Sequence, residues 1–304
     1  MQITTYRELK NKDPFMFLIA QSLSWPIVPA ELEKIINLDI RLKNSPVGFC
    51  ALEDGKLAGF VGVLDIPTKT ISGKEEMVGG IWCVATNPNF AKRGICKILM
   101  ERAHQYFKEK NYPFSFLQTS RTLIAYAIYV KMEYIEIEKI NRYPEAYKVF
   151  QKDKAETKAD AKLDPETIRV IYQEFVKKKT GFVIRQNDFL KMFAERNRFE
   201  EKKSFQDKNG YVLASSSRNV VTVQEFISWD EQTYHKLLDQ IESIAQGGVI
   251  DRMITHERLL EIYRSRGYCI EQGDHGVFMV KKLADMDFVE AYGEAFHIGV
   301  LDLF

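Results

Sequence analysis

The stretch "NPNFAKRGICKILM", residues 87–100, decides how the first half of this chain is interpreted. It follows the apolar run "VGGIWCVAT" (78–86), which is typical of a buried strand. The residues after the turn fall at the spacing of one helix face, so the stretch predicts a strand, a turn and a helix in direct succession. The apolar positions of that face are Ile95, Ile98, Leu99, Ala103 and Phe107.

The turn carries a basic pair and a glycine, namely Lys92, Arg93 and Gly94. The first amides of a helix have no partners within it and lie at the positive end of its dipole. A glycine lets a ligand approach this backbone closely, and the two basic side chains add positive charge. These features favour a phosphate-binding turn. The alternative interpretation is an ordinary basic turn exposed to solvent.

Composition limits the kinds of partner. Hydrophobic residues make up 45% and charged residues 28% of the 304 residues, a profile typical of soluble globular proteins. The net charge of +1 gives no overall electrostatic argument for nucleic acid or an anionic membrane, so an anion site must be local. No apolar run reaches the roughly 18 residues of a membrane span, and residues 1–13 lack the apolar core of a secretion signal. We expect a cytoplasmic protein that binds neither nucleic acid nor membrane.

The cysteines show none of the CxxC or CxxH spacings of zinc sites. We therefore expect free thiols, as in a reducing cytoplasm, and no metal site. The four residues are Cys50, Cys83, Cys96 and Cys269.

The chain divides at residues 151–167, which contain almost no large apolar residue. This composition predicts a solvated linker or an exposed helix, with a helix starting at Asp164-Pro165. Before the linker, Asp54-Gly55 is the strongest hairpin signal. The first half then predicts, in order, an edge strand (3–9), two helices (13–23 and 29–39), the hairpin (48–66), the strand and helix around the loop, a strand (114–120), a helix (123–134) and a strand (135–140).

The second half repeats part of this order. It predicts two strands (210–217 and 219–230), a helix (231–246), a strand (248–255), a helix (256–268) and a strand (276–283). The best internal match is "AIYVKMEY" (127–134) with "EIYRSRGY" (261–268), where each helix ends in Ile-Tyr and a second tyrosine follows. This repetition indicates tandem copies of one fold.

At this point the sequence resembles the GCN5-related N-acetyltransferase (GNAT) superfamily. The family loop is Arg/Gln-x-x-Gly-x-Gly/Ala between a strand and a helix, and Gly94 matches its central glycine. Ala91 and Cys96 stand where the family prefers Arg/Gln and Gly/Ala. The helix holding "YVKMEY" resembles the family segment Tyr-x-x-x-Gly-Phe/Tyr, with Glu133 in place of the glycine.

The resemblance implies an α/β (α+β) fold with two tandem GNAT-like domains, each a mixed, mostly antiparallel sheet flanked by helices. The layout is similar to the enhanced-intracellular-survival (Eis) acetyltransferases without their sterol-carrier-like third domain. It implies four parts: a catalytic GNAT domain (1–150), a linker (151–167), a degenerate second GNAT-like domain (168–285) and a C-terminal tail that docks near the active site (286–304).

The resemblance also implies a binding site for acetyl-coenzyme A or a related acyl-coenzyme A. The pyrophosphate would lie on the loop and the first helical turn, and the pantetheine arm and thioester along the strand edge at Val84 and Ala85. Tyr129 would protonate the leaving thiolate, although a tyrosine in the core is the alternative. The carboxylate of Phe304 would act as the base. The loop residues are Lys92, Arg93, Gly94, Ile95, Cys96 and Lys97.

The second half lacks such a loop, because "VQEFISW" passes through "DEQT" into a helix with no glycine and no basic pair. We therefore expect it to be catalytically silent and Tyr263 to be structural.

The expected function is transfer of an acetyl group from acetyl-coenzyme A to an amine by direct attack. The acceptor is a small molecule or a peptide, and the sequence does not identify it. A non-catalytic acyl-coenzyme A sensor and an assembly scaffold are the alternatives. Homo-oligomer formation is left open.

Overall fold

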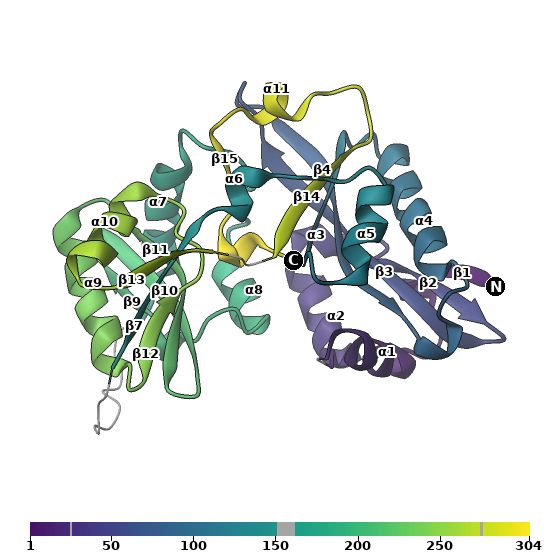
Figure 1. The fold of residues 1–304 in the computed structure, drawn as a ribbon, viewed down its shortest axis with the longest axis horizontal. Helices are drawn as coiled ribbons and strands as arrows, with labels where there is room; N and C mark the ends of the chain where they lie inside the picture. Colours follow the sequence, from purple (N-terminus) through teal and green to yellow (C-terminus); the bar gives the residue numbers. More distant parts are fainter. Residues whose placement is uncertain (25, 151–161, 274–275) are drawn as a thin grey trace. The chain divides into compact units, whose positions relative to one another are not determined.

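The computed structural model describes residues 1–24, 26–150, 162–273 and 276–304 (Figure 1). The chain forms two compact units. Unit 1 comprises Met1–Ile137, Gly276–Glu294 and Phe304, and unit 2 comprises Glu138–His275 and Ala295–Leu303. Within the described residues, no helix is both long enough and apolar enough to cross a membrane.

Unit 1 is built on one mixed sheet with the strand order β1-β2-β3-β4-β5-β14-β6. Its strands are β1 (Gln2–Thr5), β2 (Gly48–Glu53), β3 (Lys56–Lys69), β4 (Glu75–Thr86), β5 (Phe114–Thr119), β14 (Val277–Lys282) and β6 (Ile135–Glu136). Its helices are η1 (Tyr6–Glu8), α1 (Asp13–Leu23), α2 (Pro29–Leu38), α3 (Ile40–Lys43), η2 (Pro88–Phe90), α4 (Ile95–Glu109), α5 (Ile124–Lys131) and α11 (Phe288–Tyr292).

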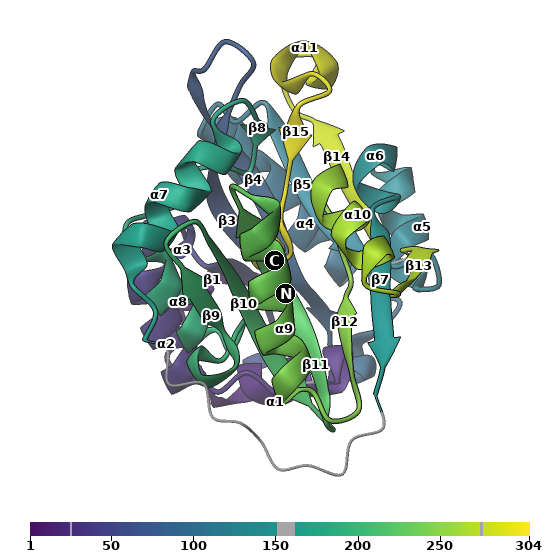
Figure 2. The ribbon, with the colours of Figure 1, turned by 90° about the vertical axis from the view of Figure 1, so that its left-hand side faces the viewer.

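Unit 2 holds a second sheet, in the order β13-β7-β12-β11-β10-β9. Its strands are β7 (Pro144–Val149), β9 (Phe205–Asp207), β10 (Gly210–Ser217), β11 (Val220–Ser228), β12 (Gly248–Asp251) and β13 (Cys269–Gln272), and β8 (Thr180–Gly181) pairs with β15 (Phe296–His297). Its helices are α6 (Glu138–Asn141), α7 (Pro165–Val176), α8 (Phe189–Glu195), η3 (Glu201–Lys203), α9 (Glu231–Ile244), α10 (Glu257–Ser265) and η4 (Val300–Asp302). Figure 2 shows α9 and α10 lying over one face of this sheet.

Several local predictions are confirmed. Asp54 and Gly55 both have positive φ (48° and 74°), as the tight turn between β2 and β3 requires. Pro29 opens α2, and Asp164 caps α7 by accepting a hydrogen bond from the Thr167 amide at 3.1 Å. The four cysteines are free thiols. The predicted strand at 135–140 is only partly correct, since β6 ends at Glu136 and α6 follows it.

The tandem fold is confirmed by the two matching helix ends. In unit 1, the Tyr134 amide donates to the Tyr129 carbonyl at 3.1 Å, across Glu133 with φ 66°. In unit 2, the Tyr268 amide donates to the Tyr263 carbonyl at 3.0 Å, across a glycine with φ 72°. This is the left-handed helix ending that normally takes glycine. The sequence repeat at these positions is therefore a structural repeat.

The strand pairing does not follow the order of the chain. β14 comes from the part of the sequence expected to form the second domain, yet it pairs with β5 and β6 in unit 1. β7 comes from the first half, yet it pairs with β12 and β13 in unit 2. Apolar alternation predicts that a segment is a strand but not which strand lies beside it. The linker predicted at 151–167 falls largely outside the described residues.

The helical stripe after the loop packs as predicted. Ile95, Leu99, Ala103 and Phe107 are buried against the sheet of unit 1, and the fifth predicted position, Ile98, is half-buried. The Phe107 ring lies 2.5 Å from the position that a Cβ on Gly79 would occupy, so a side chain at Gly79 would displace α4. The "VGG" of the opening run therefore lets the helix lie close to β4.

The exchanged strand generates a stability prediction. A fragment ending at residue 150 lacks β14 and leaves β5 and β6 without a partner between them, so we expect no cooperative thermal transition by circular dichroism. The control joins residues 1–137 by a short linker to 276–294. The Ile137 amide donates to the Phe278 carbonyl at 2.9 Å, so little linker is needed. A cooperative transition in the 1–150 fragment at the control's temperature would contradict this role of β14.

Candidate functional site

The central feature of unit 1 is the place where β4 and β5 separate. The two strands pair in parallel at Gly79–Ser115, Gly80–Phe116 and Ile81–Leu117. β4 then continues to Thr86. A bulge at Cys83, with φ 48°, shifts the register of β4 against β3 and bends the strand.

Val84 lies in that bulge, next to Cys83, and Ala85 follows directly after it. Ala85 is again paired with β3 on one side, opposite Phe60. In the described structure the other side of this stretch is not paired with β5. An extended ligand can add to such an edge through main-chain hydrogen bonds.

The loop after β4 ends at the N-terminus of α4. Gly94 is the N-cap residue, with φ 76°, and a Cβ built on it would meet no atom within 4 Å. The Ile98 amide bonds to the Gly94 carbonyl at 3.1 Å, so the amides of the preceding helical residues lie ahead of the first intrahelical bond. Gly94 has no side chain that could accept from those amides. They are placed to receive an anion from outside.

The other loop residues fit this arrangement. Lys92 and Arg93 are exposed, and the Arg93 guanidinium lies 5.4 Å from the centre of the Phe90 ring. Lys97 is exposed in the first turn, 3.8 Å from Glu101. Cys96 is half-buried, and burial raises the pKa of its thiol, so it is a packing residue rather than a thiolate. Ile95 is buried in the core.

In unit 2, the N-terminus of the equivalent helix α9 is capped by a side chain of the protein itself. Asp230 is the N-cap of α9, and its carboxylate accepts from the Thr233 amide at 2.7 Å and from the Thr233 hydroxyl at 3.0 Å. These bonds, led by the one from the Thr233 amide, lower the pKa of Asp230. The chain's own carboxylate therefore stands where unit 1 has an open glycine.

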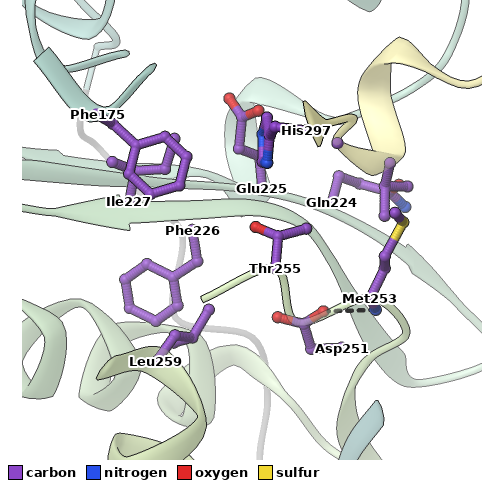
Figure 3. Close-up of a pocket in the computed structure, with 12 residues that line it drawn as sticks. Phe175, Gln224, Glu225, Phe226, Ile227, Asp251, Met253, Thr255, Leu259 and His297 are labelled. Atoms are coloured by element: carbon purple, nitrogen blue, oxygen red, sulfur yellow. Dashed lines mark hydrogen bonds between the residues drawn. The ribbon is translucent and has the colours of Figure 1, made fainter. Parts of the chain in front are cut away.

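The strand opening of unit 2 is also filled. His256 caps α10, and its Nε2 lies 3.4 Å from the Phe226 carbonyl on β11 and 3.2 Å from the Tyr234 hydroxyl. Burial lowers the pKa of His256 to about 4, so the ring is neutral at physiological pH. The remaining cavity measures about 20 Å³, room for one water molecule. Figure 3 shows Phe226, Asp251 and Thr255 among the residues that line it.

Tyr129 lies on α5 and is 4% exposed. Burial raises its pKa, and the Cys96 thiol on α4 adds to the rise, so the hydroxyl stays protonated at neutral pH. Its ring packs edge-on to Tyr134, with the ring centres 6.0 Å apart. The Tyr134 hydroxyl is in turn fixed by Ser115 at 2.6 Å and His104 at 2.8 Å.

The equivalent tyrosine of unit 2 has a different neighbour. The Tyr263 hydroxyl donates to the Asp251 carboxylate at 3.0 Å. Asp251 is the last residue of β12 that pairs with β11, and Leu117 has the same place in unit 1. Burial raises the pKa of Asp251 to about 6. Tyr263 is thus held by an internal carboxylate, whereas an apolar residue occupies that place in unit 1.

Phe304 also belongs to unit 1. Two of its ring atoms lie 3.1 Å from the position of a Cβ on Gly80, and the ring centre lies 6.2 Å from that of Phe278. Gly80 directly precedes the last β4–β5 pair. Since Gly79 faces α4, Gly80 faces the opposite side of the sheet. The chain's last residue therefore lies beside the strand opening, on the face away from α4.

Two residues of this site were not identified from the sequence, Gly80 and Cys83. The double glycine at 79–80 was a signal, because glycine within an apolar strand marks a close approach. The bulge at Cys83 had no such sequence signal, since cysteine does not favour positive φ. Among the residues that the structure describes, no group of three or more His, Cys, Asp or Glu side chains could hold a metal ion.

Comparison with known proteins agrees with this geometry. Residues 12–134 match the model of the acetyltransferase (GNAT) family. No curated protein matches the sequence. Among solved structures, similarity extends to a GCN5-related N-acetyltransferase from Kribbella flavida, with a TM-score of 0.66 and 15% identity over 93% of this chain and 72% of that one.

Two further solved structures are similar to this chain. Eis1 from Mycobacterium abscessus has a TM-score of 0.59 and 15% identity over 93% of this chain and 74% of that one. A tandem GNAT protein from the clavulanic acid biosynthesis pathway has a TM-score of 0.54 and 10% identity over 94% and 99%. At these identities the likeness establishes the fold.

The prediction of a GNAT-type acyltransferase is confirmed at the level of the family that residues 12–134 match. The predicted α/β tandem fold is confirmed as well. Residues 12–134 of unit 1 therefore match the acetyltransferase (GNAT) family, and the chain as a whole has the fold of the tandem GNAT proteins.

Proposed function

We propose that unit 1 binds acetyl-coenzyme A and transfers its acetyl group to an amine by direct attack. The observation that carries this proposal is the difference between the two equivalent helix N-termini. α4 begins at an open glycine beside two exposed basic residues, whereas α9 is capped by its own Asp230. Only the first can accept a pyrophosphate.

The coenzyme would occupy the opening from the loop inward. The pyrophosphate accepts from the amides of residues 92–97, with Lys92 and Arg93 adding positive charge. The pantetheine arm pairs with the β4 edge at Val84 and Ala85. This path leads the thioester to the bulge, with Tyr129 on the α5 side and Phe304 on the other face. A longer acyl group on the same coenzyme would use the same anchor.

In the transfer step, the amine nitrogen attacks the thioester carbonyl carbon and the C–S bond breaks. The departing thiolate takes the proton of the Tyr129 hydroxyl, and the Phe304 carboxylate takes the proton that the amine loses. The raised pKa of Tyr129 keeps this proton in place until the thiolate forms. The resemblance to the Eis-like acetyltransferases supports the assignment to Phe304, as does the position of its ring beside Gly80.

Unit 2 would take no coenzyme in this scheme. Its helix N-terminus is capped, its strand opening holds His256, and its tyrosine is bound to Asp251. A sensor that binds acyl-coenzyme A without catalysis is the second candidate, because Tyr129 is 4% exposed and Ala91 and Cys96 depart from the family loop.

Calorimetry with acetyl-coenzyme A tests the proposal first. We expect one site per chain, since unit 2 is closed. If no binding is measured, the assembly scaffold is the function that remains. Release of coenzyme A is then measured across polyamines, aminoglycosides and lysine peptides, where turnover with at least one amine is expected. If acetyl-coenzyme A binds but none of these amines is acetylated, the non-catalytic sensor is the function that remains.

The loop assignment predicts the effect of charge at Gly94. Gly94→Glu places a carboxylate beside the pyrophosphate, and we expect coenzyme affinity to fall by about a hundredfold or more. Gly94→Gln is the matched control, because both variants carry the same strain at positive φ and only one carries the charge. Equal affinities of the two variants in calorimetry would remove the loop from the binding site.

The proton-donor assignment predicts the effect of removing one hydroxyl. We expect Tyr129→Phe to lower kcat by about 10²-fold with the Kd for acetyl-coenzyme A unchanged. Because burial raises the pKa of Tyr129, the wild-type kcat should show no alkaline limb from this residue below about pH 10.

Tyr263→Phe is the control, since the same hydroxyl is removed from unit 2. It breaks the hydrogen bond to Asp251, so we expect the free energy of unfolding to fall by about 1–3 kcal/mol, which lowers the Tm. The kcat should stay at the wild-type value. Wild-type turnover in Tyr129→Phe would exclude Tyr129 from the reaction.

A further inference from the structure

The buried Tyr134 of unit 1 is fixed at both of its ends. Its amide donates to the Tyr129 carbonyl at 3.1 Å, directly after α5. Its hydroxyl lies 2.6 Å from the Ser115 hydroxyl and 2.8 Å from Nε2 of His104. All three side chains are buried, so water does not compete for these hydrogen bonds, and a satisfied buried network of this kind is rigid. We call the three side chains the Tyr134 network.

The groups of the Tyr134 network are neutral. Burial, together with the charges of Lys281 and Lys108, lowers the pKa of His104 to about 4. Burial raises the pKa of Tyr134. A tyrosine hydroxyl can donate one hydrogen bond and accept two, so it satisfies both neighbours whichever ring nitrogen of His104 carries the proton. The hydrogen bonds of the network therefore persist at neutral pH.

The Tyr134 network joins three elements that border the proposed site. His104 lies on α4, the helix that begins at the loop. Ser115 lies on β5 and is the first residue of that strand to pair with β4. Tyr134 follows α5, the helix that holds Tyr129. The hydroxyl of Tyr134 thus ties the end of α5 both to the strand beside the opening and to the helix behind the loop.

The orientation of Tyr129 depends on its packing. Among the described residues its hydroxyl has no hydrogen-bond partner, which leaves the proton available to a thiolate. Its ring lies edge-on to the Tyr134 ring, with the ring centres 6.0 Å apart. A proton donor must stay within hydrogen-bond reach of the atom that it serves, and a displacement of about 1 Å can lower a rate by about a hundredfold. A Tyr134 ring that could move would therefore lower turnover without contacting the coenzyme.

Unit 2 has the same tyrosine without the network. Tyr268 is the equivalent of Tyr134, and its amide donates to the Tyr263 carbonyl at 3.0 Å. The Tyr268 hydroxyl is buried and has no hydrogen-bond partner within the part of the chain that the structure describes. Since unit 2 forms the same helix ending in this way, the fold does not require the network. The network is present in the unit whose helix N-terminus is open.

We propose that Tyr134 is a positioning residue for acyl transfer: its hydroxyl, bound to Ser115 and His104, fixes the ring against which the proton donor Tyr129 packs. This role rests on the proposed function. Tyr134 itself does not touch the reacting atoms, and it acts through the orientation of Tyr129.

The first test removes one hydroxyl from each unit. Tyr134→Phe breaks the network and keeps the ring, so we expect kcat to fall by about tenfold. The Kd for acetyl-coenzyme A should stay unchanged, because the loop and the β4 edge keep their residues. Tyr268→Phe is the matched control, since it removes the equivalent hydroxyl where no hydrogen bond is lost, and it should keep the wild-type kcat. Thermal unfolding checks that both variants remain folded.

Ser115→Ala weakens the network from the other side. It removes one of the two hydrogen bonds and leaves Tyr134 intact, so we expect a smaller fall in kcat, about threefold. This variant tests the proposal even where Tyr134→Phe does not fold. The effects of the two substitutions should not add, because both break the same hydrogen bond. The double variant should therefore have the kcat of Tyr134→Phe alone.

A second measurement reports on the Tyr129 ring without catalysis. 3-Fluorotyrosine at position 129 gives a ¹⁹F resonance that depends on the rings packed around it. We expect the resonance to move in Tyr134→Phe and in Ser115→Ala, because the Tyr129 ring then leaves its single orientation, and to keep its position in Tyr268→Phe. Ser115→Ala is the sharper comparison, since it changes no aromatic ring.

The outcomes separate the two proposals. If the wild type acetylates no amine, the proposed function fails, and the ¹⁹F resonance alone decides whether the Tyr134 network orients Tyr129. If Tyr134→Phe and Ser115→Ala keep the wild-type kcat and resonance, the positioning role is wrong. It is also wrong if kcat falls while the resonance of Ser115→Ala stays in place, or if Tyr268→Phe loses as much turnover as Tyr134→Phe.

Discussion

The site of unit 1 depends on two strands that separate while each stays paired on its outer side. β4 remains bonded to β3 as far as Thr86, and β5 remains bonded to β14 as far as Thr119. Those outer ladders keep each strand in the sheet beyond Ile81 and Leu117, where β4 and β5 stop pairing with each other. The bulge at Cys83 turns β4 away at the point of separation. An opening for an extended ligand is thus a consequence of backbone hydrogen bonding rather than of any one side chain.

The two units show that the same fold can keep or close this opening with few changes. A glycine at the start of α4 leaves the helix amides available, and Asp230 at the start of α9 occupies them. In unit 1 the apolar Leu117 stands where unit 2 has Asp251. Asp251 accepts a hydrogen bond from Tyr263, the equivalent of Tyr129. His256 fills the space where a ligand strand would lie. In unit 2, Asp230, Asp251 and His256 thus each make a hydrogen bond within the chain at these places.

The C-terminal segment, residues 295–304, is ordered by contacts with residues far from it in the sequence. Residues 295–303 belong to unit 2, and the next residue, Phe304, belongs to unit 1. Here Arg185, Arg198 and the β8–β15 pairing order the segment up to Leu303. The apolar residue at the terminus then packs beside Gly80.

The sequence by itself determined the local structure: the Asp-Gly hairpin, the helix after the loop, the glycine at its N-terminus and the repeat around Tyr129 and Tyr263. These follow from neighbouring residues, whose periodicity and backbone preferences act over a few positions. Only the tertiary structure decided that β7 and β14 exchange sheets, that Cys83 carries the bulge, and that Arg185 meets Asp302. Strand partners and buried ion pairs join residues far apart in the chain, so no local pattern records them.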